Sequence, residues 1–98
     1  MLATSILKCV MLAKFQTLVV TEPINEYAQA SIERIHNGFN FSGDVIEGKL
    51  NSVSIESKTF NLKTLSFASR DLNQRSLSTM LEYKGQHASL ECEITESL

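Results

Sequence analysis

The sequence has no tryptophan, one proline, two cysteines and four glycines among its 98 residues. Two cysteines are too few for the disulfide framework of a small secreted domain, so we predict that Cys9 and Cys92 are buried free thiols. The glycines are scattered along the chain, which excludes a glycine-rich phosphate-binding loop. No nucleotide cofactor is therefore expected.

The chain also lacks an excess of positive charge, with 9 Lys and Arg against 11 Asp and Glu. A nucleic-acid surface needs basic residues interleaved with aromatic residues on one sheet face. In the second half of the chain glutamates are interspersed among the lysines and arginines. A nucleic-acid partner is therefore not expected.

Residues 1–20 are strongly apolar, yet they have neither the early positive charge nor the cleavage site of a signal peptide. As part of a membrane span, Lys8 and Lys14 would each cost about 2.5–3.5 kcal/mol. We therefore predict a cytoplasmic protein without membrane contact. Within this segment we expect a short helix over residues 3–13 and a strand over residues 15–21, leaving apolar surface for a second subunit to cover.

The segment TEPINEYAQASIERIHNG, residues 21–38, has the pattern of an amphipathic helix. Pro23 suits a first helical turn, and Asn37-Gly38 suits a helix end because glycine readily adopts a left-handed conformation. Apolar side chains recur at helical spacing, at Ile24, Tyr27, Ala28, Ile32 and Ile35. We predict a helix over residues 23–36.

The sequence pattern of residues 44–96 predicts antiparallel strands. Apolar and polar residues alternate over residues 76–84 and 87–96, and Gly85 between them suits a hairpin turn. Two earlier strands are expected over residues 45–56 and 59–68. In the first, a change of parity indicates a bulge near residues 48–51. In the second, either a bulge lies near Lys63-Thr64 or both faces of the strand are partly covered.

The whole chain, residues 1–98, is thus predicted to be a single α+β domain. It would consist of the apolar segment, a helical segment over residues 22–37, and a four- to five-stranded antiparallel sheet. The amphipathic helix would pack on one face of that sheet.

No catalytic or metal site is predicted. His87 and Cys92 are the first pair to test for a thiol nucleophile, but residues five apart on one strand point to opposite faces. The histidines and cysteines are too far apart in sequence to suggest a metal cluster. We expect a non-enzymatic protein without cofactors.

Two binding sites are considered. A small-ligand pocket between helix and sheet would be lined by Tyr27, Phe39, Phe41, Phe60 and Phe67, unless these aromatic residues simply fill the core. Arg70 and Arg75 lie in the most polar loop and are candidates for binding an anion. The alternative is that Arg70 pairs with Asp71 or with solvent.

The segment MLEYKGQHASLE, residues 80–91, resembles the opening strand and turn of HicB-type antitoxins. The resemblance covers these residues alone and lies where this chain is ending, so we transfer no function from it. We hypothesise a small interaction module, acting as a homodimer or as an accessory subunit of another protein. The alternatives are a small-ligand-binding domain and an antitoxin-like or nucleic-acid-binding regulator.

Overall fold

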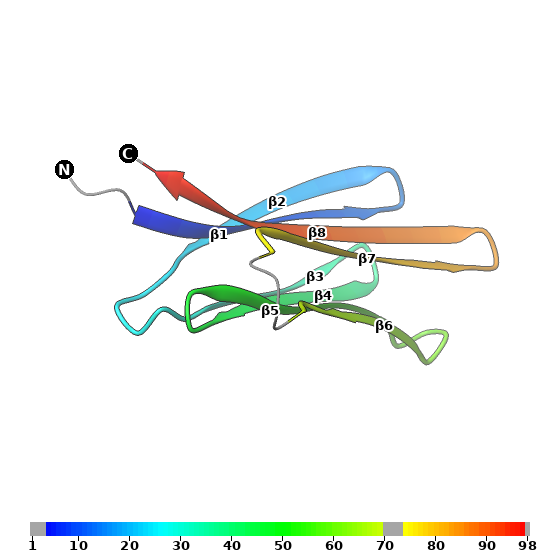
Figure 1. The fold of residues 1–98 in the computed structure, drawn as a ribbon. Helices are drawn as coiled ribbons and strands as arrows, with labels where there is room; N and C mark the ends of the chain where they lie inside the picture. Colours follow the sequence, from blue (N-terminus) through cyan, green and yellow to red (C-terminus); the bar gives the residue numbers. More distant parts are fainter. Residues whose placement is uncertain (1–3, 70–73, 98) are drawn as a thin grey trace.

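The computed structural model describes residues 4–69 and 74–97, and every regular element in these ranges is a strand. The strands are β1 Thr4–Ala13, β2 Gln16–Pro23, β3 Ala30–His36, β4 Phe39–Ile46, β5 Lys49–Ser57, β6 Leu62–Phe67, β7 Ser76–Tyr83 and β8 Gln86–Ser97. They form two antiparallel sheets, in the orders β2-β1-β8-β7 and β3-β4-β5-β6. Figure 1 shows the sheets stacked face to face. The predicted α+β class is therefore wrong, because the fold is all-β.

The predicted helix over residues 23–36 is replaced by the end of β2, a turn and the whole of β3. The Asn25 side-chain oxygen accepts hydrogen bonds from the backbone N–H groups of Tyr27 (2.9 Å) and Gln29 (3.0 Å) and thereby builds the turn. Asn37 and Gly38 have φ values of 48° and 86°, as a two-residue hairpin turn requires. A helix of about fifteen residues is marginal alone, whereas β3 pairs along its length with β4.

The predicted helix over residues 3–13 is also wrong, because this segment is β1. Its inward side chains alternate and are fully buried, at Leu7, Cys9, Met11 and Ala13. β1 lies between β2 and β8 in its own sheet, and contacts β3 and β4 of the other. The same chain therefore covers the inner face of this apolar segment, and no second subunit is needed there.

The strand predictions are largely confirmed. Residues 15–21 correspond to β2, residues 59–68 to β6, residues 76–84 to β7 and residues 87–96 to β8, with small shifts at the ends. In each of these segments the period-two pattern or the β-branched content matches the pleat of a half-buried strand.

The predicted single strand over residues 45–56 is two strands. A turn at Glu47-Gly48 separates β4 from β5, and Gly48 has a φ of 75°. A register shift does occur, but it lies between Asp44 and Val45 instead of at residues 48–51. The change of parity in the sequence therefore marks a turn as well as a bulge.

One core lies between the two sheets. Its buried apolar residues come from both layers, namely Leu7, Cys9, Met11, Ala13, Ile32, Phe39, Phe41, Val45, Leu50, Val53, Ile55, Leu77, Leu81, Ala88, Leu90 and Cys92. Alternate residues of each strand supply this core because successive side chains of a strand point to opposite faces.

A disulfide joins Cys9 of β1 to Cys92 of β8, which corrects the prediction of free thiols. The two residues are directly opposite in the β1–β8 register, with Cα atoms 4.0 Å apart. Opposite residues of this kind approach most closely where they exchange no backbone hydrogen bonds. The predicted burial of both residues is confirmed, since each has an exposed fraction of 0%.

Gly43 on β4 packs against this disulfide from the facing sheet. A Cβ atom built at Gly43 would lie 2.7 Å from Cys92 Sγ and 3.2 Å from Cys9 Sγ. The sheets can approach here only because residue 43 has no side chain.

No helix within residues 4–69 and 74–97 is long and apolar enough to cross a membrane.

Candidate interaction site at the turn end of the sandwich

Four turns lie at one end of the sandwich, on the right of Figure 1, and we call this the turn end: residues 14–15, 37–38, 58–61 and 84–85. Hydrogen bonds tie the first two turns together. Asn37 Nδ2 donates to the carbonyl oxygen of Ala13 (3.0 Å) and to Oε1 of Gln16 (2.7 Å). His36 Nε2 donates to the carbonyl oxygen of Gln16 (2.9 Å). This part of the turn end therefore presents a fixed surface.

The described strands include four two-residue hairpin turns in which both residues have positive φ. The second residue is glycine in three of them, at Gly38, Gly48 and Gly85. In the fourth, between β1 and β2, the second residue is Phe15, with a φ of 65°. A left-handed conformation costs an L-residue with a side chain about 1–2 kcal/mol. The Phe15 turn is therefore the one that departs from the favoured turn sequence.

The Phe15 ring gains no burial in return for this backbone conformation. Its exposed fraction is 103%, the highest among the exposed large apolar residues of the described chain. A groove of about 400 Å³ lies beside it, between the β1–β2 and β7–β8 turns, lined by Leu12, Lys14, Phe15, Gly85, Gln86 and His87. An apolar ring next to a groove of this kind is a surface suited to contact with another molecule.

Lysine side chains are frequent at this end of the sandwich, and Lys14 lines the groove together with Phe15. The turns of this end carry Lys14, Lys58 and Lys84, and Lys84 Nζ lies 5.4 Å from the centroid of the Tyr83 ring. Glu82 is an acidic residue of this end, and its Oε2 lies 4.0 Å from His87 Nδ1. The turn end therefore combines a fully exposed aromatic ring with several cationic side chains.

The five aromatic residues predicted to line a ligand pocket do not meet in one cavity. Phe39 and Phe41 are buried in the core, with ring centroids 6.4 Å apart. Phe60 contacts Tyr83 edge-on at 5.0 Å. Tyr27 and Phe67 are exposed, in the β2–β3 connection and on β6. The alternative reading, in which aromatic residues fill the core, holds for Phe39 and Phe41.

The predicted anion site cannot be placed as a pair. Arg70 lies outside the described residues. Arg75 is exposed just before β7, and its carbonyl oxygen accepts a hydrogen bond from the backbone N–H of Ile94 (3.0 Å). The anion site stays a prediction from the sequence.

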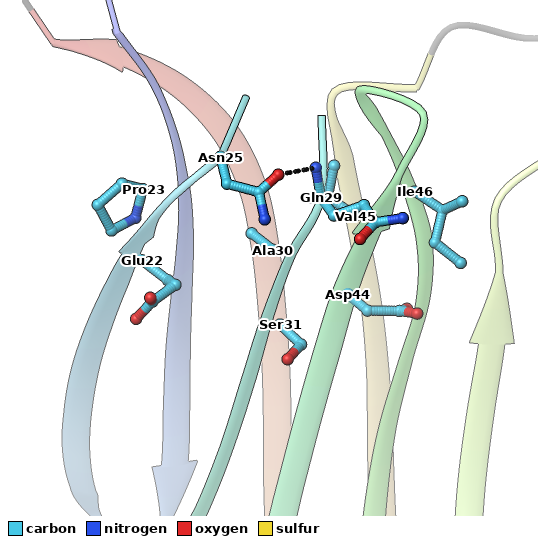
Figure 2. Close-up of a pocket in the computed structure, with 9 residues that line it drawn as sticks. All are labelled: Glu22, Pro23, Asn25, Gln29, Ala30, Ser31, Asp44, Val45 and Ile46. Atoms are coloured by element: carbon cyan, nitrogen blue, oxygen red, sulfur yellow. Dashed lines mark hydrogen bonds between the residues drawn. The ribbon is translucent and has the colours of Figure 1, made fainter. Parts of the chain in front are cut away.

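A polar hollow of about 500 Å³ lies at the opposite end of the sandwich (Figure 2), lined by Glu22, Pro23, Asn25, Gln29, Ala30, Ser31, Asp44, Val45 and Ile46. Figure 2 shows the bond from Gln29 to the Asn25 side chain that closes the turn above it. The Asp44 carboxylate accepts bonds from Asn51 Nδ2 (3.2 Å), Ser52 N (3.0 Å) and Ser52 Oγ (2.8 Å). Asp44 thus holds the irregular part of the β4–β5 pairing.

The prediction about the thiol pair is confirmed in its geometry. Cys92 points into the core and is bonded to Cys9, whereas His87 is half-exposed on the outer side of β8. Within the described ranges no three His, Cys, Asp or Glu side chains converge as a metal site would require.

Comparisons of this chain with protein-family models, with curated proteins and with solved structures find no match. The Phe15 turn was not predicted from the sequence because Ala13-Lys14-Phe15-Gln16 contains none of the glycine or asparagine residues that mark a hairpin turn. One signal was present: Lys14 and Phe15 separate two apolar segments of similar length.

Proposed function

We propose that this protein is a non-enzymatic interaction module that binds another protein through its turn end. The observation that carries the proposal is Phe15, a fully exposed apolar ring on a left-handed residue. Strained backbone conformations cluster at functional sites, and large aromatic side chains dominate the energetics of protein interfaces.

The charges around Phe15 favour an acidic partner. Lys14 lines the groove beside Phe15, and Lys58 and Lys84 lie in two other turns of the same end. An aromatic anchor inserted into an apolar pocket of the partner would therefore have cationic residues at its side and farther out on the same surface. Complementary charge at the rim of an interface mainly raises the association rate and gives it a dependence on salt. We therefore expect association to slow as the salt concentration rises.

The test compares wild-type protein with the Phe15→Gly variant as baits for the same extract, followed by titration of any purified partner. Phe15→Gly places glycine at the second turn position, where the other three hairpin turns already have it. We therefore expect the variant to stay folded. We expect loss of the partner and a fall in affinity of about tenfold or more. Equal binding by both baits, or capture of no partner by either, would overturn the proposal.

Nucleic acid is the competing class of partner for a surface with lysines and aromatic rings. We favour protein because Phe60 and Tyr83 contact one another at 5.0 Å, so Phe15 is the aromatic ring of the turn end that is fully exposed for stacking. Titration with single-stranded DNA and RNA distinguishes the two. Tight, salt-sensitive binding that Phe15→Gly abolishes would assign the site to nucleic acid and refute the protein assignment.

The cytoplasmic location predicted from the sequence rested on the charge pattern of residues 1–20. Because disulfides persist mainly in oxidising compartments, the Cys9–Cys92 bond favours an oxidising compartment instead. Alkylation of the protein in intact cells, followed by mass spectrometry, tests this. If Cys9 and Cys92 are both recovered as alkylated thiols after denaturation, the protein resides in a reducing compartment and the assignment to an oxidising one is wrong.

A further inference from the structure

The edge of the second sheet at β6 presents free backbone hydrogen-bonding groups. The backbone N–H of Ala68 donates to the carbonyl oxygen of Asn51 (3.0 Å), which makes this opposite pair a hydrogen-bonded one. By alternation along the β5–β6 register, residues 62, 64 and 66 face β5. The backbone groups of residues 63, 65 and 67 therefore point away from the sheet, and no other part of the described chain bonds to them.

The side chains of the same three residues lie on the outer face of the sheet. Lys63 is exposed, and the exposed fractions of Leu65 and Phe67 are 48% and 67%. β7 of the other sheet contacts β6 but belongs to the other layer, so it does not occupy the position next to β6 in its own sheet. This edge thus offers unpaired backbone groups and exposed apolar side chains together.

The other edge strands carry features that discourage pairing. On β2, Pro23 occupies an outward backbone position, since its neighbour Ile24 bonds to Ser5 of β1, and proline has no N–H to offer. β3 exposes Glu33 and Arg34, and β7 exposes Glu82. Charged residues and proline on edges are the usual protection against unwanted strand pairing. β6 carries only Lys63 in this role.

We propose that β6 pairs with β6 of a second copy of this chain, antiparallel, about a two-fold axis at Leu65. In this register Leu65 faces Leu65 of the second copy, and Lys63 faces Phe67 of the second copy, twice by symmetry. The outward backbone groups of both strands then face each other, as hydrogen-bonded pairs require. Each lysine lies beside an aromatic ring, an attractive pairing across strands.

This register is self-complementary, which is the property an isologous interface needs. In a register shifted by one residue, the outward backbone groups of one strand would lie opposite residues of the second copy that bond to their own β5. The apolar side chains of the two strands would then lie on opposite faces. The interface involves one short strand of each copy, so the dimer is expected to be weak and concentration-dependent.

The first test compares Leu65→Lys with Ile35→Lys by sedimentation equilibrium. Leu65→Lys sets two like charges opposite each other at the axis and is expected to raise the dimer dissociation constant about tenfold or more. Ile35 is the matched control, because it lies on the outer face of the other edge strand of the same sheet and has an exposed fraction of 78%. Ile35→Lys is expected to leave the dimer unchanged. Circular dichroism verifies that both variants are folded.

The second test identifies the register through Phe67→Glu and Phe67→Lys. Both variants remove the aromatic ring, but glutamate would face Lys63 of the second copy, whereas lysine would repel it. We expect Phe67→Glu to dimerise about tenfold more tightly than Phe67→Lys. Net charge works in the opposite direction, because it changes from −2 to −3 in the first variant and to −1 in the second. Equal weakening by both would overturn this register.

The proposal is distinct from binding at the turn end, and the two fail separately. A wild-type protein that is monomeric at high micromolar concentration refutes the β6 pairing while leaving the Phe15 site to its own test. If the wild-type protein dimerises and Leu65→Lys does not weaken the dimer, the β6 pairing is refuted and the protein self-associates through another surface. Loss of partner binding in Phe15→Gly with an unchanged dimer is the outcome expected if both are correct.

Discussion

Cys9 and Phe15 belong to the same β1–β2 hairpin and have opposite environments. Cys9 is fully buried and bonded to Cys92, with Gly43 fitted against the two sulfur atoms. Phe15 is fully exposed on a left-handed residue, next to a turn end that carries lysines. In the interior of this hairpin the side chain is buried and cross-linked, which stabilises the fold. At its tip an apolar ring is exposed on a left-handed residue, which costs stability.

The difference between Cys9 and Phe15 indicates that the disulfide gives this small domain enough stability to tolerate an unfavourable turn. A cross-link between the first and last strands restricts the unfolded chain, which stabilises the fold independently of the turns. A domain held in this way tolerates a residue at its tip that costs stability. The buried disulfide and the exposed tip can each be tested by substitution.

Removing the disulfide should have the largest effect. The bond closes a loop spanning 83 positions, and loss of a loop of this length is expected to lower the free energy of unfolding by about 4 kcal/mol. Urea unfolding of the Cys9→Ala/Cys92→Ala variant measures it. A loss of less than about 1 kcal/mol would mean that the sandwich does not depend on the cross-link.

Gly43→Ala should destabilise the protein by about 1–3 kcal/mol, because the new methyl group would overlap the sulfur atoms of the disulfide. The cost should fall when Gly43→Ala is placed in the Cys9→Ala/Cys92→Ala background, where no sulfur atoms remain. Urea unfolding of the four proteins gives the coupling free energy. Strict additivity would show that the contact between Gly43 and the disulfide is not the cause.

Gly85→Ala isolates the cost of a left-handed residue with a side chain. Gly85 has a φ of 79°, and nothing lies within 4 Å of a Cβ atom built there, so no collision contributes. We expect a loss of about 1 kcal/mol in the free energy of unfolding, measured by urea titration. No measurable loss would remove the energetic basis for regarding the Phe15 turn as strained.

Phe15→Gly should have the smallest effect and the opposite sign. Because glycine accepts the left-handed conformation and the ring makes no buried contact, we expect a gain of about 0.5–1 kcal/mol in the free energy of unfolding. Thermal and urea unfolding against wild type provide the measurement. A loss of stability would show that the Phe15 ring packs on the protein and is not held out for a partner.

The last two strands could be predicted from the sequence because their pattern is local. Leu77 and Leu81 on β7 and Leu90 and Cys92 on β8 alternate with polar residues, and one face of each strand is buried accordingly. The same alternation correctly separated Cys92 from His87. Side-chain parity is a property of the strand alone, so no knowledge of its neighbours is needed.

The helix over residues 23–36 was predicted wrongly because its pattern is ambiguous. Ile24, Tyr27, Ala28, Ile32 and Ile35 fit a helical stripe, but in the structure Tyr27 and Ile35 are exposed while Ile32 is buried. Asn37-Gly38 is compatible with a helix end and with a hairpin turn. Pairing with β4 decided between them, and that pairing involves residues outside the segment.

Local patterns were enough to predict which residues of the last two strands face inward and that Gly85 permits a hairpin turn, since both depend on neighbouring residues alone. Three features followed from the fold alone: residues 4–13 form a strand, Cys9 meets Cys92, and Phe15 is exposed to solvent beside Lys14. Each of these depends on strand register, which brings together residues far apart in the chain through hydrogen bonds that no local pattern encodes.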